Sequence, residues 1–60
     1  MTREEISSLQ TQIDVCIEEE EKLNDWENRF IESISNQLTE IGILSERQKE
    51  TLKKLYDRVV

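Results

Sequence analysis

The stretch LNDWENRF, Leu23 to Phe30, decides how the rest of the chain is organised. It has the features of a helix start, because Asn24 is a preferred N-cap residue and Glu27, three residues later, completes a capping box. Leu23 stands just before the N-cap, where an apolar residue often packs against the first turn. Trp26 and Phe30 are four residues apart, so a helix places both rings on one face. We therefore predict a helix that begins at residue 25, beside a packed corner.

Two further capping patterns predict the other helices. Thr2 with Glu5, and Ser45 with Gln48, each have the N-cap and N3 spacing of a capping box. Gly42 predicts the end of the middle helix, since glycine readily adopts the left-handed conformation found just after many helices. The predicted helices span about 3–22, 25–41 and 46–59, and the fold class is all-α.

Only a few residues connect the second and third predicted helices, which favours an antiparallel helical hairpin. Each of these helices has an apolar stripe with the spacing of three and four residues that marks one buried face. Leu44 precedes the last helix as a second apolar staple residue. The residues that we expect to be buried are Trp26, Phe30, Ile34, Leu38, Leu52, Leu55 and Val59.

The first predicted helix carries its own apolar stripe, which we expect to form an interface between subunits of a coiled-coil-like bundle. We expect a homodimer or a small homo-oligomer, and antiparallel pairing is favoured because parallel pairing would place Glu20 against its copy. The chain then divides into an acidic oligomerisation or partner-binding helix, 1–23, and a hairpin module, 24–60. The predicted interface residues are Ile6, Leu9, Ile13, Cys16 and Ile17.

The same apolar series also fits one uninterrupted helix through the Asn24 region. Positions 6, 13, 20, 27, 34 and 41 and positions 9, 16, 23, 30 and 37 continue without a change of phase. A helix over residues 3–41 would be a rod roughly 58 Å long at 1.5 Å per residue. Against the rod, Glu20 and Glu27 would occupy interface positions, and Asn24 with Asp25 is a better helix start than middle. Both alternatives remain open at this point.

Composition limits the chemistry that the chain is expected to perform. It has 60 residues, no His, one Cys (Cys16) and one Gly. We expect no disulfide, metal site, cofactor or catalytic residue, because the usual acid–base, zinc and glycine-rich phosphate sites need residues that this sequence lacks. A chain this short also buries a modest core, which favours association with a partner or a second copy.

No apolar run approaches the roughly 18 residues that a membrane helix needs, and the first residues lack a hydrophobic signal region. We therefore expect a cytoplasmic protein with no membrane contact. A free thiol fits a reducing compartment, and Cys16 at an apolar helix position is expected to fill the core.

Charge changes sign along the chain, whose net charge is −6. Residues 1–23 carry seven acids and two bases, residues 24–41 four acids and one base, and residues 42–60 three acids and five bases. Solvated helix faces of complementary sign explain much of this pattern. A sharper interpretation is an acidic surface for a basic partner, wrapping a full helical turn and formed by Glu18, Glu19, Glu20 and Glu21. A third is direct nucleic-acid binding through Lys49, Lys53, Lys54 and Arg58, which the net negative charge opposes.

The segment from Leu23 to Val59 resembles a short helical module that recurs in phage-encoded and phage-derived DNA-processing proteins. The shared pattern is a Trp-Glu helix start, an aromatic, a Ser and a Gln on following turns, a Gly break, Leu-Ser-x-x-Gln and a terminal Leu-Tyr-x-Arg-Val turn. Its residues here are Trp26, Glu27, Phe30, Ser33, Gln37, Gly42, Leu44, Ser45, Gln48, Leu55, Tyr56, Arg58 and Val59. The resemblance implies a phage or mobile-element origin, in the cytoplasm of the host, near DNA-processing or defence machinery. It supplies no catalytic residue.

Three functions follow as hypotheses. The first is a non-enzymatic phage protein that binds a host or phage protein complex as an inhibitor, a counter-defence protein or an accessory. The second is a structural or assembly protein that self-associates through the first helix. The third is a nucleic-acid accessory that uses the basic last helix.

Overall fold

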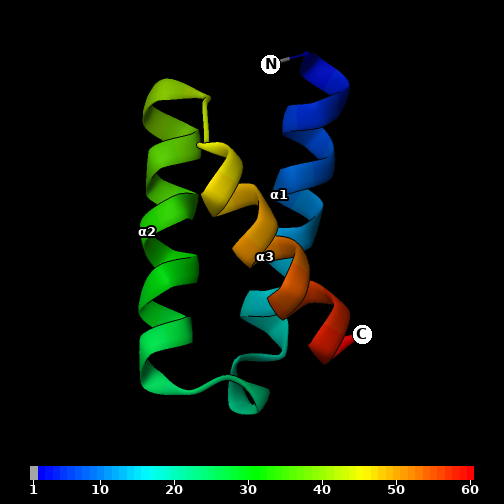
Figure 1. Cartoon of the computed structure of the whole chain (residues 1–60), viewed down its shortest axis with the longest axis vertical. Coiled ribbons are helices and arrows are strands. Elements are labelled where there is room, and N and C mark those ends of the chain that lie inside the picture. The colour runs from blue at the N-terminus through cyan, green and yellow to red at the C-terminus, as the bar shows by residue number, and fades with distance from the viewer. Residues whose placement is uncertain (1) are drawn as a thin grey trace.

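The computed structural model describes residues 2–60 and is all-helical, which confirms the predicted fold class. Helix α1 spans Arg3–Glu18, α2 spans Asp25–Ile41 and α3 spans Glu46–Val59. A short 3-10 turn, η1, covers Glu20–Lys22. In Figure 1, α1 and α2 run side by side and α3 lies across the front between them. The predicted bounds of α2 and α3 are confirmed, whereas the first helix ends at Glu18 and not at residue 22.

The continuous rod is contradicted, because the chain turns between α1 and α2. The Asn24 side chain accepts a hydrogen bond from the Glu27 N–H at 2.8 Å, and the Asn24 N–H donates to the Glu27 carboxylate at 2.9 Å. The Asn28 amide donates to the backbone carbonyls of Glu20, at 3.2 Å, and Leu23, at 3.3 Å. Leu23 is buried beneath this corner. The hydrogen bonds of the cap therefore decide the backbone conformation here. The unbroken heptad series describes only the spacing of apolar side chains, and it does not require a continuous helix.

The turn from α2 to α3 is held by a second set of bonds. Gly42 has a φ of 69° and its N–H donates to the Leu38 carbonyl at 2.9 Å. Ser45 and Gln48 form the predicted capping box. The amides of Gln37 and Gln48 also exchange hydrogen bonds at 3.0 and 3.1 Å, linking α2 to α3. These bonds fix the angle at which α3 leaves the turn.

Gly42→Ala should destabilise the protein by about 1 kcal/mol, because an L-residue in the left-handed conformation crowds its own carbonyl. The space around Gly42 is open, with only the Leu38 carbonyl oxygen 3.9 Å from an added Cβ, so the penalty comes from the backbone alone. Gly42→Asn is the matched control and should lose less, since asparagine tolerates this conformation. Urea unfolding followed by circular dichroism measures both. Equal stability of Gly42→Ala and the wild type would contradict the left-handed conformation of residue 42.

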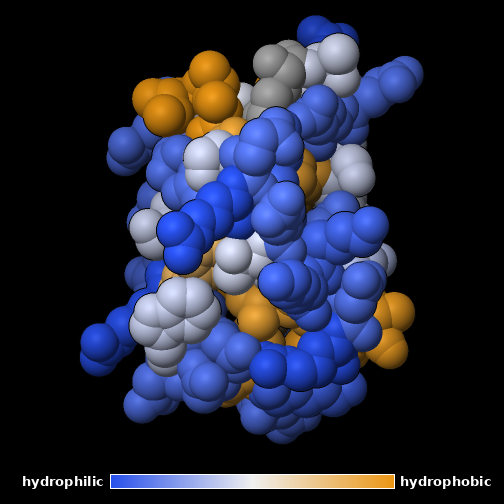
Figure 2. Space-filling model, viewed as in Figure 1, coloured by the Kyte–Doolittle hydropathy of each residue, from blue (hydrophilic) through white to orange (hydrophobic). Residues whose placement is uncertain are grey.

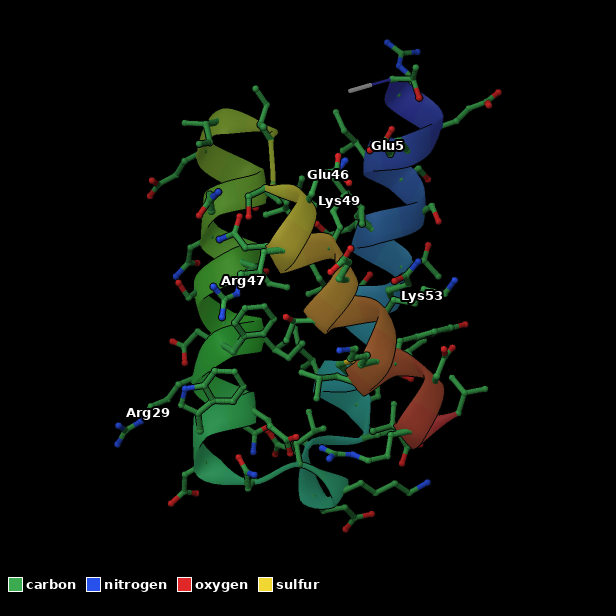
Figure 3. All side chains as sticks on the ribbon, viewed as in Figure 1. Glu5, Arg29, Glu46, Arg47, Lys49 and Lys53 are labelled. Carbon is green, nitrogen blue, oxygen red and sulfur yellow. The ribbon has the colours of Figure 1, made fainter. Side chains whose placement is uncertain are left out.

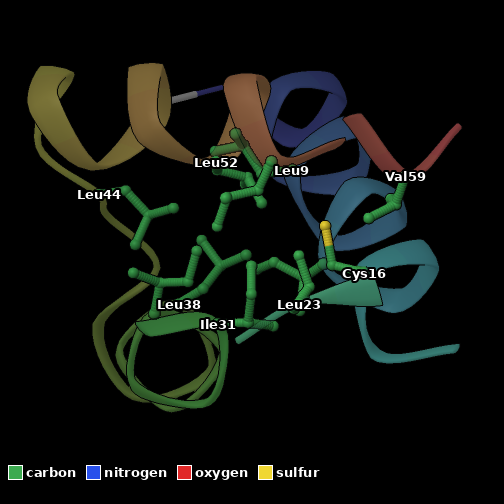
Figure 4. Close-up of a cluster of buried hydrophobic side chains, with 11 residues drawn as sticks. Leu9, Cys16, Leu23, Ile31, Leu38, Leu44, Leu52 and Val59 are labelled. Atoms are coloured by element: carbon green, nitrogen blue, oxygen red, sulfur yellow. The ribbon is translucent and has the colours of Figure 1, made fainter. Parts of the chain in front are cut away.

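One hydrophobic core is shared by all three helices, as Figure 4 shows. Helix α1 packs against both other helices, and its contact with α3 is the most extensive of the three. The first helix is therefore part of the folded unit formed with residues 24–60, and α2 and α3 are not a hairpin packed mainly on itself. The core residues are Leu9, Ile13, Cys16, Leu23, Ile31, Ile34, Leu38, Leu44, Leu52, Leu55 and Val59.

The predicted subunit interface is used within the single chain. Leu9, Ile13 and Cys16 are buried in the core, and Ile6 packs partly buried against it. Ile17 is 47% exposed. A helix presents the same apolar stripe whether it meets another helix of its own chain or one of a second copy, so an interface between subunits through α1 stays a prediction.

The predicted buried set is confirmed for five of its seven residues, with Phe30 half-buried and Trp26 wrong. Trp26 is 63% exposed. The inward face of α2 consists of Ile31, Ile34 and Leu38, and Glu27 continues this face at the first turn. Because Trp26 precedes Glu27 by one residue, about 100° of helix rotation directs it away from the core.

None of the helices within residues 2–60 combines the length and the apolar character needed to cross a membrane.

Candidate binding surface

Trp26 and Phe30 form an aromatic pair on the outer side of α2. Their ring centroids are 5.5 Å apart and their planes differ by 10°, so the rings are stacked. Phe30 packs against the hydrophobic core, whereas most of Trp26 is exposed. The indole is therefore held in place through Phe30 while much of its surface remains open to a partner.

A shallow groove adjoins this pair, where the start of α3 passes α2. We call it the Trp26 groove; it is lined by Trp26, Phe30, Ser45, Arg47, Gln48 and Thr51. Arg47 of α3 lines the groove together with the two rings. Figure 3 shows Arg47 on the α2 side of α3, and Arg29 extending outward from α2. The groove thus combines the largely exposed Trp26, the partly buried Phe30 and one guanidinium group, that of Arg47.

Helix register extends the positive charge along α3. Arg47, Thr51, Lys54 and Arg58 are spaced by three or four residues and share one side of this helix. Arg58 is bound there by an ion pair with Glu27. That guanidinium and the N–H of Asn24 hold the pKa of Glu27 below its ordinary value. The acids Glu50 and Asp57 border this stripe on the outer side of α3, which limits the width of the positive surface.

The four predicted nucleic-acid residues do not form one open basic surface. The Lys49 ammonium lies 2.8 Å from the Glu5 carboxylate of α1 and 3.2 Å from that of Glu46. These two carboxylates raise the pKa of Lys49, and the hydrogen bond from Lys49 lowers the pKa of Glu5. Lys49 and Lys53 lie on the α1 side of α3, away from Arg47 (Figure 3). Glu5 also takes part in the cap at the start of α1, where the Thr2 hydroxyl accepts a hydrogen bond from the Glu5 N–H at 3.1 Å.

The four glutamates 18–21 lie at the corner between α1 and α2. The block does not wrap one helical turn as predicted, because α1 ends at Glu18 and η1 begins at Glu20. Glu19 pairs with Lys22 at 3.1 Å, whereas Glu18, Glu20 and Glu21 are exposed. Their role as a partner surface stays a prediction.

A second shallow depression lies beside this acidic corner, between α1 and α2. Ile17 and Glu20 line it on one side and residues of α2 on the other, and the buried Ile31 contributes to its wall. An exposed isoleucine with glutamates around it is compatible with a basic, partly apolar partner. Its full lining is Ile17, Glu20, Asn28, Ile31, Glu32, Ser35 and Asn36.

Within residues 2–60, neither a reactive thiol nor a metal site is formed by the Cys, Asp and Glu side chains. The Cys16 thiol is buried and its burial raises its pKa, which disfavours the reactive thiolate. In this part of the chain no three Cys, Asp or Glu side chains come together as metal ligands would.

Sequence reasoning missed the Trp26 groove, because it assigned the tryptophan to the core and counted Arg29 and Arg47 only toward segment charge. The available signal was the register of Trp26 with respect to Ile31 and Ile34 on the same helix. A step of three residues back from Ile34 leads to Ile31, and a further step of four leads to Glu27, not to Trp26.

Compared with models of protein families, with curated proteins and with solved structures, the chain matches none. The resemblance to a phage-encoded helical module stays a prediction.

Proposed function

We propose that this protein is a non-enzymatic binding module that recognises another protein through the Trp26 groove. The observation that carries the proposal is a 63%-exposed tryptophan fixed by stacking on a partly buried phenylalanine. Tryptophan and arginine dominate the residues that supply most of the binding energy in protein interfaces, and both types line this groove. Its backbone is set by two capping boxes, so binding requires little ordering of the groove.

The biological setting of the proposal rests on the sequence resemblance alone. We propose that the protein is phage-encoded and acts in the host cytoplasm as an inhibitor or accessory of a defence or DNA-processing complex. A small rigid module without a catalytic role acts by occupying a surface of its target, which suits inhibition or adaptation.

A second candidate function is capture of a basic partner at the acidic corner. It is favoured by the exposed Ile17 beside Glu18, Glu20 and Glu21. Self-association through α1 has less support, because the central residues of its apolar stripe already pack within the chain. Association of two copies would have to use other surfaces, such as Ile41 and Ile43 at the α2–α3 turn, where Figure 2 shows a group of hydrophobic residues.

Trp26→Ala is expected to reduce capture of the partner by at least about tenfold, as truncation of a central interface tryptophan usually does. The tagged protein is used to capture partners from nuclease-treated host lysate, and bound proteins are quantified by mass spectrometry. The helical circular dichroism of this variant should equal that of the wild type, because Trp26 lies outside the core.

Two control variants make the capture experiment decisive. Ile43→Ala removes an exposed apolar side chain elsewhere and should leave capture unchanged. Exchange of Glu18, Glu20 and Glu21 for Gln tests the acidic corner. If this triple variant loses the partner and Trp26→Ala retains it, the acidic corner is the binding site and the Trp26 groove is not.

A further inference from the structure

The Trp26 groove has a charge opposite in sign to that of the whole chain. Arg47 lines the groove, and Lys54 and Arg58 follow it on the same side of α3, although the net charge of the chain is −6. Glu27 already neutralises Arg58. Within residues 2–60, no acidic side chain lies within ion-pair distance of Arg47 or Lys54. Two cations therefore stand unpaired on this side of α3, Arg47 in the groove lining and Lys54 two turns further along the helix.

We propose that the occupant of the Trp26 groove is an acidic amphipathic helix of the partner protein, with one large apolar side chain against the Trp26 indole and carboxylates that pair with Arg47 and Lys54. This inference rests on the proposed function and names the chemistry of its partner. A groove between two helices is the usual seat of such a segment, whose apolar residues repeat every three or four positions. The spacing of Arg47 and Lys54, seven residues along α3, is about 10 Å at 1.5 Å per residue, so carboxylates two turns apart on the partner match it.

The observations favour a protein segment over a nucleic acid. A phosphate backbone presents a continuous line of negative charge, which Glu50 and Asp57 beside the basic stripe would repel along with the net charge of the chain. Discrete carboxylates on a helix meet the two unpaired cations, Arg47 and Lys54, and avoid those two acids. A single aromatic pair also offers few stacking positions for successive bases.

The experiment selects binders from a displayed library of random peptides of about 16 residues, roughly four helical turns. Selected peptides are then titrated against the protein while the fluorescence of Trp26 is recorded. Trp26 is the only tryptophan, so selected peptides without tryptophan make this signal a direct report from the groove. We expect the selected peptides to be acidic, with Leu or an aromatic at helical spacing, and to change the Trp26 emission on binding.

Two adjacent lysines supply the matched variants. Lys54→Glu, on the groove side of α3, should weaken the selected peptides by at least about tenfold, since it places a like charge against their carboxylates. Lys53→Glu makes the same charge change on the α1 side and should leave the affinity within about twofold at physiological salt, where distant charges are screened. Arg47→Glu should behave like Lys54→Glu.

Several results would overturn the inference. These are no enrichment, enrichment without an acidic bias, or equal losses from Lys53→Glu and Lys54→Glu. Quenching of Trp26 by an oligothymidylate of about 15 nucleotides at physiological salt, lost in Lys54→Glu, would assign the groove to nucleic acid instead. If Trp26→Ala abolishes partner capture but the selected peptides are not acidic, the proposed function stands and only this partner chemistry fails. If Trp26→Ala also leaves capture intact, both proposals fail.

Discussion

Ile13→Ala is expected to unfold a large part of the population at room temperature. Ile13 is 0% exposed at the middle of α1, and removing such a side chain costs roughly 2–5 kcal/mol, partly through the cavity left behind. The hydrophobic core of a domain of about 60 residues contributes only about 3–5 kcal/mol to the free energy of unfolding. The loss is therefore comparable with the whole stability of the protein, and thermal unfolding followed by circular dichroism should show it directly.

Ile17→Ala is the matched control, because it makes the same change one turn further along α1 at a 47%-exposed position. It should cost less than about 1 kcal/mol, as most surface substitutions do. Melting curves at two protein concentrations, about a hundredfold apart, distinguish the intramolecular core from a subunit interface. An unfolding midpoint that rises with concentration in the wild type, together with a folded Ile13→Ala monomer, would contradict the intramolecular core and restore the interface predicted from the sequence.

Glu27→Ala is expected to be the most destabilising substitution of any carboxylate in the chain. The Glu27 side chain is only 10% exposed, accepts a hydrogen bond from the Asn24 N–H and pairs with Arg58, so one carboxylate joins the start of α2 to the end of α3. Glu27→Gln keeps a capping group and loses the ion pair, and it should lie between Glu27→Ala and the wild type. Glu32→Ala, at an exposed position on α2, is the control and should be nearly neutral. Equal effects of Glu27→Ala and Glu32→Ala in urea unfolding would contradict this role.

The ion pair between Glu27 and Arg58 also predicts that the stability of the protein depends on pH. Arg58 and the Asn24 N–H lower the pKa of Glu27 in the folded protein below its ordinary value of 4.5. The folded state therefore binds this proton less readily than the unfolded state, and the contribution is present above the ordinary pKa and lost as the pH falls through the lowered one. The difference in unfolding free energy between the wild type and Glu27→Gln should thus be constant near neutral pH and shrink below about pH 4. A difference that stays constant in acid would show that the ion pair does not contribute.

Residue pairs close in sequence made most of the fold predictable. The capping partners Asn24 and Glu27, and Ser45 and Gln48, are three residues apart, so their hydrogen bonds depend only on the local backbone. Gly42 ended α2 for an equally local reason. The first helix lacks such a stop signal, so its end was predicted near residue 22 and not at Glu18. The break depends on contacts at the corner, where Leu23 is buried and the Asn28 amide donates to its carbonyl.

The candidate site was far less predictable, because its parts come from different helices. The sequence by itself determined an all-helical chain, the start of each helix and the apolar stripes that bury Ile34 or Leu52, since these follow from bonds and periodicities of a few residues. Only the tertiary structure decided that α1 packs within the chain, that Arg58 binds Glu27 and that Trp26 faces outward beside Arg47. An apolar stripe specifies that a surface must be covered, but the identity of its cover depends on the angles at which the two turns direct the helices.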